Sequence, residues 1–220
     1  MCNHYSSSGA WRDRMGEFSQ LRLPAFDAER ARPNVQGPDI WPAYTGEVLR
    51  VESDKLITEA ATWLFVPFWF KKPFAEWRKT NGGCNNAKGE TAETSGVFKH
   101  AAKSGRCLIP GEAFFEYAKE RGADGKKPEY RFAYPDGRSF FFAGLRSNAD
   151  LPDKGPITTY TMVTKPPGPD VRSIGHHRQP VVLAPDELGA WLDPANAITG
   201  FLEPSPKGTF TVELARGVPA

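Results

Sequence analysis

The stretch EYRFAYPDGRSFFFAGL, at positions 129–145, carries the clearest structural signal in this chain of 220 residues. Two runs rich in aromatic and other β-favouring residues flank the tripeptide Pro135-Asp136-Gly137. Such a tripeptide is typical of a tight turn, and the flanking runs are typical of strands. The stretch therefore predicts a β-hairpin, which makes antiparallel pairing the first expectation for the fold.

Further strands are predicted on both sides of this hairpin. They are EVLRVE at 47–52, ATWLFV at 61–66, RCLIP at 106–110, AFFEYA at 113–118, ITTYTMVT at 157–164, PVVLA at 180–184 and GTFTVEL at 208–214. Short helices are predicted at 11–22, at 96–103 and at 185–192, the last beginning with proline and acidic residues. There is no βαβ rhythm, repeat or linker. We expect a single α+β domain over residues 1–220, with a mainly antiparallel, barrel-like sheet and short flanking helices.

Charge is unevenly distributed along the chain, although the formal net charge is only +2. Between positions 71 and 106 there are eight Lys or Arg against three Glu, with Trp77 among them. This local excess suits an anionic partner such as nucleic acid. The alternative is a solvated charged face with no partner.

Targeting and cysteine patterns favour the cytoplasm. The first twenty residues lack the apolar core of a secretory signal, and the longest apolar run, at 63–70, is too short to cross a bilayer. Three widely spaced cysteines, Cys2, Cys84 and Cys107, form no C-x-x-C pair. This spacing argues against a disulfide framework and against an ordinary zinc site. We expect neither a metal nor a cofactor.

Cys2 lies in a polar segment, MCNHYSSSGA at 1–10, where a core has little use for a thiol. Removal of Met1 would give Cys2 a free α-amine beside that thiol. The amine titrates near ~7.7–8 and the thiol near ~8.5, so both are expected to be partly nucleophilic at neutral pH. A 1,2-aminothiol condenses with an aldehyde to an imine and then closes a thiazolidine ring. The alternatives are a thiol nucleophile that uses its own amine as base, and an incidental surface cysteine.

Three other segments carry candidate chemistry. NNAKGETAE, at 85–93, suggests an ordered polar loop, or else a simple turn. In RCLIPGEAFFEY, at 106–117, Glu116 stands among aromatic residues, where desolvation would raise its pKa and suit it to proton transfer. The alternative is an outward-facing glutamate on an edge strand. SIGHHRQPVVL, at 173–183, offers histidines for proton relay and an arginine for phosphate, or else a polar loop before a strand.

Together these segments resemble the SRAP family, the SOS-response-associated peptidase-like proteins. The resemblance spans nearly the whole chain and rests on ordered blocks. They are Cys2 after Met1, DIWPAYTGEVLRV at 39–51, WLFVPFW at 63–69, NAKGET at 86–91, RCLIPGEAFFEY at 106–117, and HHRQP at 176–180 followed by VVL. The resemblance implies binding of single-stranded DNA that contains an abasic site. It also implies capture of the lesion aldehyde by Cys2 as a thiazolidine crosslink, which shields the lesion, and self-processing that removes Met1.

The resemblance also implies catalytic roles for three residues besides Cys2. Asn86 matches the family's active-site asparagine, which holds the substrate or the terminus by hydrogen bonds. Glu116 matches the acid that assists opening of the sugar ring and formation of the imine. His176 matches the histidine that assists proton transfer, including reversal of the crosslink.

Five further positions are matched to DNA contacts. Lys88 and Arg178 match basic positions that contact phosphates, and Phe68 and Trp69 match an aromatic region that packs against bases. His4 stands where the family often has an arginine that binds phosphate, and either takes over that contact or packs against the domain. Gln179 in place of a common methionine, and the longer basic segment after Trp69, also depart from the family pattern.

The resulting expectation is a monomeric cytoplasmic protein, associated with the nucleoid on DNA damage, with lyase-like Schiff-base chemistry and autoproteolytic removal of Met1. Two other classes stay open. One is an amidohydrolase with an N-terminal cysteine nucleophile, and the other is a non-covalent binder of single-stranded DNA.

Overall fold

The computed structural model describes residues 2–14, 25–26, 37–81 and 84–219. Its strands are β1 (His4–Ser6), β2 (Ala25–Phe26), β3 (Asp39–Ile40), β4 (Thr45–Glu52), β5 (Lys55–Trp63), β6 (Asn86–Lys88), β7 (Arg106–Gly111), β8 (Ala113–Tyr117), β9 (Glu129–Ala133), β10 (Phe140–Leu151), β11 (Gly155–Lys165), β12 (Gln179–Pro180), β13 (Val182–Leu183) and β14 (Thr211–Arg216). Its helices are η1 (Ala10–Arg14), α2 (Phe74–Asn81), α3 (Gly89–Ala92), α4 (Lys99–Ser104), α5 (Pro169–Arg172), η2 (Pro185–Glu187), α6 (Leu188–Leu192) and η3 (Ile198–Phe201).

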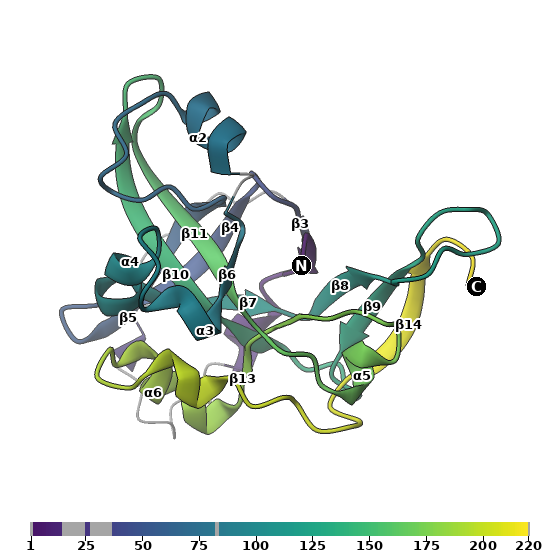
Figure 1. The fold of residues 1–220 in the computed structure, drawn as a ribbon. Coiled ribbons are helices and arrows are strands. Elements are labelled where there is room, and N and C mark those ends of the chain that lie inside the picture. Colours follow the sequence, from purple (N-terminus) through teal and green to yellow (C-terminus); the bar gives the residue numbers. More distant parts are fainter. Residues whose placement is uncertain (1, 15–24, 27–36, 82–83, 220) are drawn as a thin grey trace.

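The strands form two sheets, mostly antiparallel, so the expected α+β fold is confirmed. In the larger sheet, β11, β10, β7, β4 and β5 are neighbours in that order, and β5 pairs again with β11. This last, parallel pairing closes five strands into a barrel. The smaller sheet has the order β14-β9-β8-β1-β3 and projects from the barrel as an arm that ends near the C-terminus (Figure 1).

The predicted hairpin at 129–145 is wrong in its pairing, although both of its strands and its turn exist. Gly137 has the positive φ of a turn glycine, and its N–H donates to the carbonyl of Tyr134. However, β9 pairs with β8 and β14, whereas β10 pairs with β7, β11 and β13. The turn therefore passes the chain from the arm to the barrel. β9 and β10 lie in different sheets, so pairing with strands far away in the chain outweighs the local turn.

The remaining predictions locate the elements but misplace some ends. Of the predicted strand at 61–66, residues 61–63 are the end of β5, which begins at Lys55, and residues 64–66 follow it without strand structure. The strand predicted at 180–184 is divided into β12 and β13. At the division, the N–H of Val181 donates to Val163 of the barrel and its carbonyl accepts from Ala143. Of the helix predicted at 11–22, residues 11–14 belong to η1 and the rest lies outside the described residues.

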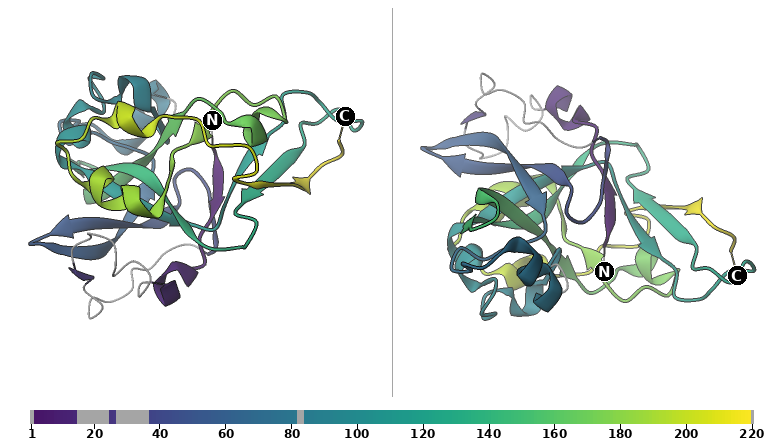
Figure 2. Two further views of the ribbon diagram at one scale, coloured as in Figure 1. Left: turned by 90° about the horizontal axis from the view of Figure 1, so that it is seen from below. Right: turned by 90° about the horizontal axis from the view of Figure 1, so that it is seen from above.

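One apolar cluster joins the arm to the barrel and includes Cys2. Trp63 and Phe142 of the barrel share this cluster with Phe114 and Phe132 of the arm. β1 runs through the junction between the two sheets, as Figure 2 shows from above and below. The start of the chain is thus built into the core at the junction. No helix in the described part of the chain has the length and apolar character that crossing a membrane requires.

Candidate active site

Cys2 is fully buried two residues before β1, at the junction of the barrel and the arm. Its Sγ atom lies 3.3 Å from the carbonyl oxygen of His4 and 3.9 Å from that of Phe115. Burial raises the pKa of the Cys2 thiol well above its ordinary range, and the nearby carboxyl of Glu116 raises it further. Burial thus disfavours ionisation of the thiol while Met1 is attached, and the expectation of a partly ionised thiol after Met1 removal stays a prediction.

The main chain of Cys2 is held by two neighbouring asparagines. The Nδ2 atom of Asn86 donates to the Cys2 carbonyl at 2.7 Å, and that of Asn85 donates to the same oxygen at 3.2 Å. Asn85 also donates to the Oδ1 atom of Asn3 at 2.9 Å. Asn86 begins β6, which pairs in parallel with β11 of the barrel. These contacts fix the main chain of Cys2 against the barrel.

A carboxyl and an imidazole meet beside this terminus. Glu116 lies on β8, between β1 and β9, and only 2% of the residue is exposed. The reading of Glu116 as an outward-facing residue is thereby excluded. The Oε2 atom of Glu116 lies 3.2 Å from the Nε2 atom of His176, and the Nδ1 atom of His176 lies 2.8 Å from the carbonyl oxygen of Arg178.

Burial shifts the pKa values of Glu116 and His176 in opposite directions, because it disfavours the charged form of each group. It raises the pKa of Glu116 to about 8 and lowers the pKa of His176 to about 4. Near pH 7 the carboxyl is therefore mostly protonated and the imidazole is neutral. Such a pair holds a proton donor and a proton acceptor at one place, which suits general acid–base chemistry.

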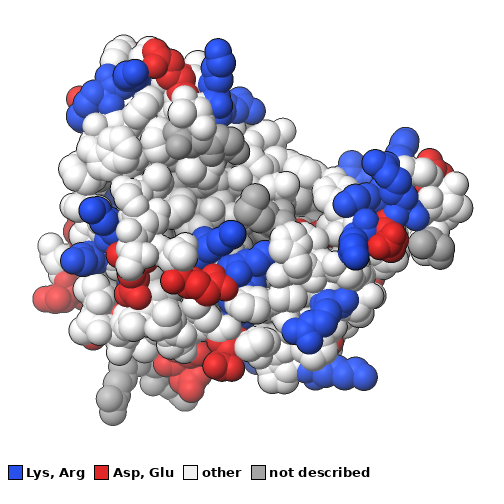
Figure 3. Space-filling view, in the orientation of Figure 1, with Lys and Arg blue, Asp and Glu red and all other residues white. Residues whose placement is uncertain are grey.

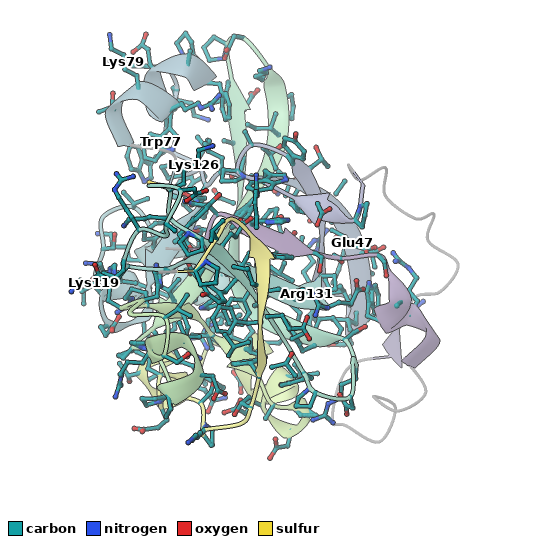
Figure 4. The ribbon with its side chains drawn as sticks, turned by 90° about the vertical axis from the view of Figure 1, so that its right-hand side faces the viewer. Glu47, Trp77, Lys79, Lys119, Lys126 and Arg131 are labelled. Atoms are coloured by element: carbon teal, nitrogen blue, oxygen red, sulfur yellow. The ribbon has the colours of Figure 1, made fainter. Side chains whose placement is uncertain are left out.

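A cavity of about 620 Å³ opens over this pair. It is lined by Asn3, Glu116, Tyr117, Arg121, Lys126, Lys127, His176, Arg216 and Gly217. Four of these residues are basic, and all four come from the arm. Figure 4 shows one of them, Lys126, from the side of the arm. An acid–base pair therefore lies at the wall of a cavity that carries strong positive charge.

His4 does not reach this cavity. Its ring is stacked between those of Trp41 and Phe115, with ring centroids 3.9 Å and 3.8 Å away. Its Nε2 atom lies 3.0 Å from Asp39 Oδ1 and its Nδ1 atom 3.3 Å from Glu129 Oε1. With 7% of the residue exposed and both nitrogens facing carboxylates, the side chain packs within the domain. This geometry contradicts a phosphate contact by His4 and favours the packing alternative.

Arg178 is also engaged within the domain. Its guanidinium donates two hydrogen bonds to the carboxylate of Glu90, at 2.6 and 2.9 Å, and a third to the carbonyl of Thr164 at 2.7 Å. A phosphate contact by Arg178 would have to share this group with Glu90. Lys88, by contrast, is exposed at the end of β6. The two basic positions matched to phosphates thus differ in how freely their charges face solvent.

The two aromatic residues matched to base stacking are exposed. Phe68 is 44% and Trp69 is 48% exposed, in the connection between β5 and α2. The ring of Trp69 meets that of Trp77 edge to face at 6.0 Å, and the ring of Phe68 lies 4.3 Å from that of His100. Neither residue lines the cavity beside Glu116. The structure therefore brings together Cys2, Asn86, Glu116 and His176, and leaves the aromatic pair as a separate surface.

Sequence reasoning missed Asn85 and the basic residues of the cavity. Asn85 was visible as the first residue of the NN pair, but nothing in the pattern said that both amides turn towards Cys2. The segment KERGADGKK at 119–127 is visibly basic, yet its position over Glu116 depends on the β8–β9 pairing. Among the residues that the structure describes, no three His, Cys, Asp or Glu side chains gather as they would around a metal ion.

Residues 1–214 match the model of one family, described as SOS response associated peptidase (SRAP). Three curated relatives carry the name abasic site processing protein. YoqW of Bacillus subtilis is 30% identical over 64% of this chain and 59% of its own length. YedK of Escherichia coli is 27% identical over 87% of this chain and 79% of its own length. HMCES of Gallus gallus is 28% identical over 86% of this chain and 62% of its own length. The chain thus spans about three fifths of the length of the first of these relatives.

Solved structures show the same fold. A crystal structure of a protein from Bordetella bronchiseptica has a TM-score of 0.74 and 26% identity, and the match covers 98% of this chain and 100% of the other. A second crystal structure, from Bacteroides thetaiotaomicron, has a TM-score of 0.77 at 21% identity, with 98% and 93% covered.

Proposed function

Because this chain belongs to the SOS response associated peptidase (SRAP) family, we propose that it processes abasic sites in single-stranded DNA by a covalent crosslink through Cys2. The curated relatives named abasic site processing proteins support the lesion as substrate. The observation that carries the crosslink is the arrangement of the terminus. Cys2 is held by the amides of Asn85 and Asn86 beside the Glu116–His176 pair.

The reaction begins with removal of Met1, which hydrolyses one peptide bond and leaves the α-amine of Cys2 free. That amine attacks the C1′ aldehyde of the ring-opened sugar and forms an imine, with loss of one water molecule. The Cys2 thiol then adds to the imine carbon. One C–S bond forms, the S–H proton passes to the nitrogen, and the product is a thiazolidine ring.

The protonation states at the site determine the order of these reaction steps. The raised pKa of the Cys2 thiol keeps it protonated, so the amine acts first and the thiol second. Neutral Glu116 donates a proton to the ring oxygen as the sugar opens, and to the hydroxyl that leaves as water. Neutral His176 accepts the proton that the attacking amine loses. Asn86 keeps the terminal residue in place while these bonds change.

Intact-mass spectrometry tests the proposal. The purified protein should lack one methionine residue. After incubation with abasic single-stranded DNA, its mass should increase by that of the DNA minus one water. The control is the same DNA after borohydride reduction, which removes the aldehyde and should leave the protein unmodified. A protein that binds the abasic strand without any mass increase would be a non-covalent binder, and release of ammonia from glutamine would instead indicate an amidohydrolase.

A further inference from the structure

The arm carries a set of cations that the proposed chemistry does not use. Arg121, Lys126 and Lys127 come from the connection between β8 and β9, and Arg216 ends β14. All four line the cavity over Glu116, and Glu116 is the one acidic residue of that lining. In Figure 3, basic side chains gather on the projecting arm, at one side of the molecule. We call Arg121, Lys126, Lys127 and Arg216 the arm cations.

The connection that bears these cations is ordered. Its two ends are joined by a hydrogen bond from Ala118 N to Pro128 O at 2.9 Å, and its tip by one from Gly122 N to Lys126 O at 2.7 Å. Gly125 takes the positive φ that this tight loop requires. A side chain at Gly122 would clash with the carbonyl of Val218 in the C-terminal segment. The N–H of Lys119 donates to the carbonyl of Ile174, two residues before His176. The loop is thus fixed to the segment that carries the catalytic histidine.

The arm cations differ in how far nearby groups engage them. Arg216 is paired with buried Glu129 at 2.6 Å, and Arg121 donates to the carbonyl of Gly125. Asp124 accepts a hydrogen bond from the backbone N–H of Lys126, not from its ammonium group. No carboxylate of the described residues pairs with the side chain of Lys126 or Lys127. Two exposed ammonium groups therefore stand unneutralised at the mouth of the catalytic cavity, where an anion would satisfy both.

We propose that Lys126 and Lys127 bind backbone phosphates of the DNA strand on one side of the lesion, so that the arm holds one flank of the substrate. This inference rests on the proposed function, because it takes the cavity as the place of the abasic sugar. Phosphates are the suitable ligand because they repeat along the strand and match point charges on flexible stems. The aromatic pair Phe68 and Trp69 lies outside this cavity, on the connection that precedes α2. The DNA on the arm side of the lesion would therefore be held by lysine–phosphate contacts, and the DNA on the other side by stacking on the aromatic pair.

Equilibrium binding to DNA containing a reduced abasic site tests this assignment, because such DNA has no aldehyde and cannot crosslink. One strand carries nucleotides only 5′ of the lesion, and a second carries them only 3′. The test variant is Lys126→Gln/Lys127→Gln. The matched control is Lys154→Gln/Lys207→Gln, which also removes two exposed positive charges, neither of which lines the cavity.

The test variant should bind one of the two strands about five- to twentyfold more weakly at low salt and the other strand less than twofold more weakly. For the affected strand, the plot of log binding constant against log salt concentration should become less steep by ~1.4. Two phosphate contacts are lost, and each single-strand phosphate contact contributes ~0.7 to the steepness. The control should change either affinity less than twofold. Equal weakening of both strands, or equal effects in test and control, would show only general attraction to charge and would overturn the assignment.

Failure of the proposed function is seen separately, in the mass of the wild-type protein after incubation with an unreduced abasic strand. If no adduct forms but one flank still depends on Lys126 and Lys127, the arm binds DNA and the crosslinking chemistry is wrong. If the adduct forms and neither flank depends on the two lysines, the chemistry stands and the arm assignment is wrong.

Discussion

The Nε2 atom of His176 faces the Oε2 atom of Glu116 at 3.2 Å. The Nδ1 atom of His176 lies 2.8 Å from the carbonyl oxygen of Arg178, so Nδ1 carries the ring hydrogen and Nε2 is the acceptor. With the pKa of Glu116 raised to about 8 and that of His176 lowered to about 4, the carboxyl is mostly protonated near pH 7 and the imidazole is neutral. Glu116 is the acid of the pair and His176 is its base.

Cys2→Ala should abolish the stable adduct with abasic DNA. The alanine amine can still form an imine, but no thiol is present to close the ring, so the product should survive only after trapping with borohydride. Denaturing gel electrophoresis with and without borohydride gives the readout. A Cys2→Ala protein whose untrapped adduct is as stable as that of wild type would disprove the thiazolidine.

Glu116→Gln should slow crosslinking by ~10²–10⁴-fold with little change in DNA affinity, since glutamine keeps the shape but cannot transfer a proton. The pH profile is more specific. The wild-type rate should rise as the amine deprotonates near ~8 and fall again as Glu116, with its pKa of about 8, loses its proton. In Glu116→Gln the falling limb should disappear. Its persistence in the variant would assign that limb to another group.

Glu116→Gln should make the folded protein more stable than wild type at alkaline pH. The folded pKa of Glu116 is raised from 4.5 to about 8, so the folded state binds the proton more tightly than the unfolded state between these values. Stability therefore falls as pH rises through that window, by an amount on the order of a few kcal/mol. Glu116→Gln removes the charge, so its free energy of unfolding should exceed that of wild type at pH 9 and be similar at pH 4. Urea unfolding at both pH values provides the measurement, and a variant less stable than wild type at pH 9 contradicts the burial argument.

His176 and His177 form a matched pair of test and control. The rings are 5.1 Å apart, but only His176 faces Glu116, and His177 is exposed. His176→Ala should slow both formation and reversal of the adduct by ~10²-fold, whereas His177→Ala should change either rate less than twofold. Time courses of crosslinking measure the rate of adduct formation. Time courses of release of the protein from DNA to a competing aldehyde measure the rate of reversal. The reverse pattern would mean that the base is His177.

His4 should matter for stability and not for phosphate binding. Its ring fills the space between Trp41 and Phe115 and bridges Asp39 and Glu129. Truncation to alanine should therefore cost ~2–4 kcal/mol in unfolding free energy, from the lost ring packing and the lost contacts with the two carboxylates. Binding of reduced abasic DNA between pH 6 and 8 should follow the same pH profile in wild type and in His4→Arg. A loss of wild-type affinity at pH 8 that arginine restores would return His4 to the DNA contacts.

How far the sequence predicts this protein is seen most clearly at residues 129–145. The composition of the two runs and the turn between them were readable, because strand propensity and turn chemistry depend on near neighbours. The pairing was not, because β9 and β10 each choose partners far away in the chain. Glu116 shows the same division. Its aromatic neighbours predicted a raised pKa, but the cavity and the contact with His176 come from β8 lying inside a sheet.

The sequence by itself determined which segments become strands, that the fold is α+β, and that removal of Met1 would leave an aminothiol at Cys2. These properties are local, since they depend on residue type, short periodicity and position in the chain. Only the tertiary structure decided the burial and thiol pKa of Cys2, the partners of His4 and the position of the arm cations. Cys2 meets Asn86 across 84 positions and His4 meets Glu129 across 125. Burial and charge at such contacts set the protonation of a side chain, and no local pattern contains them.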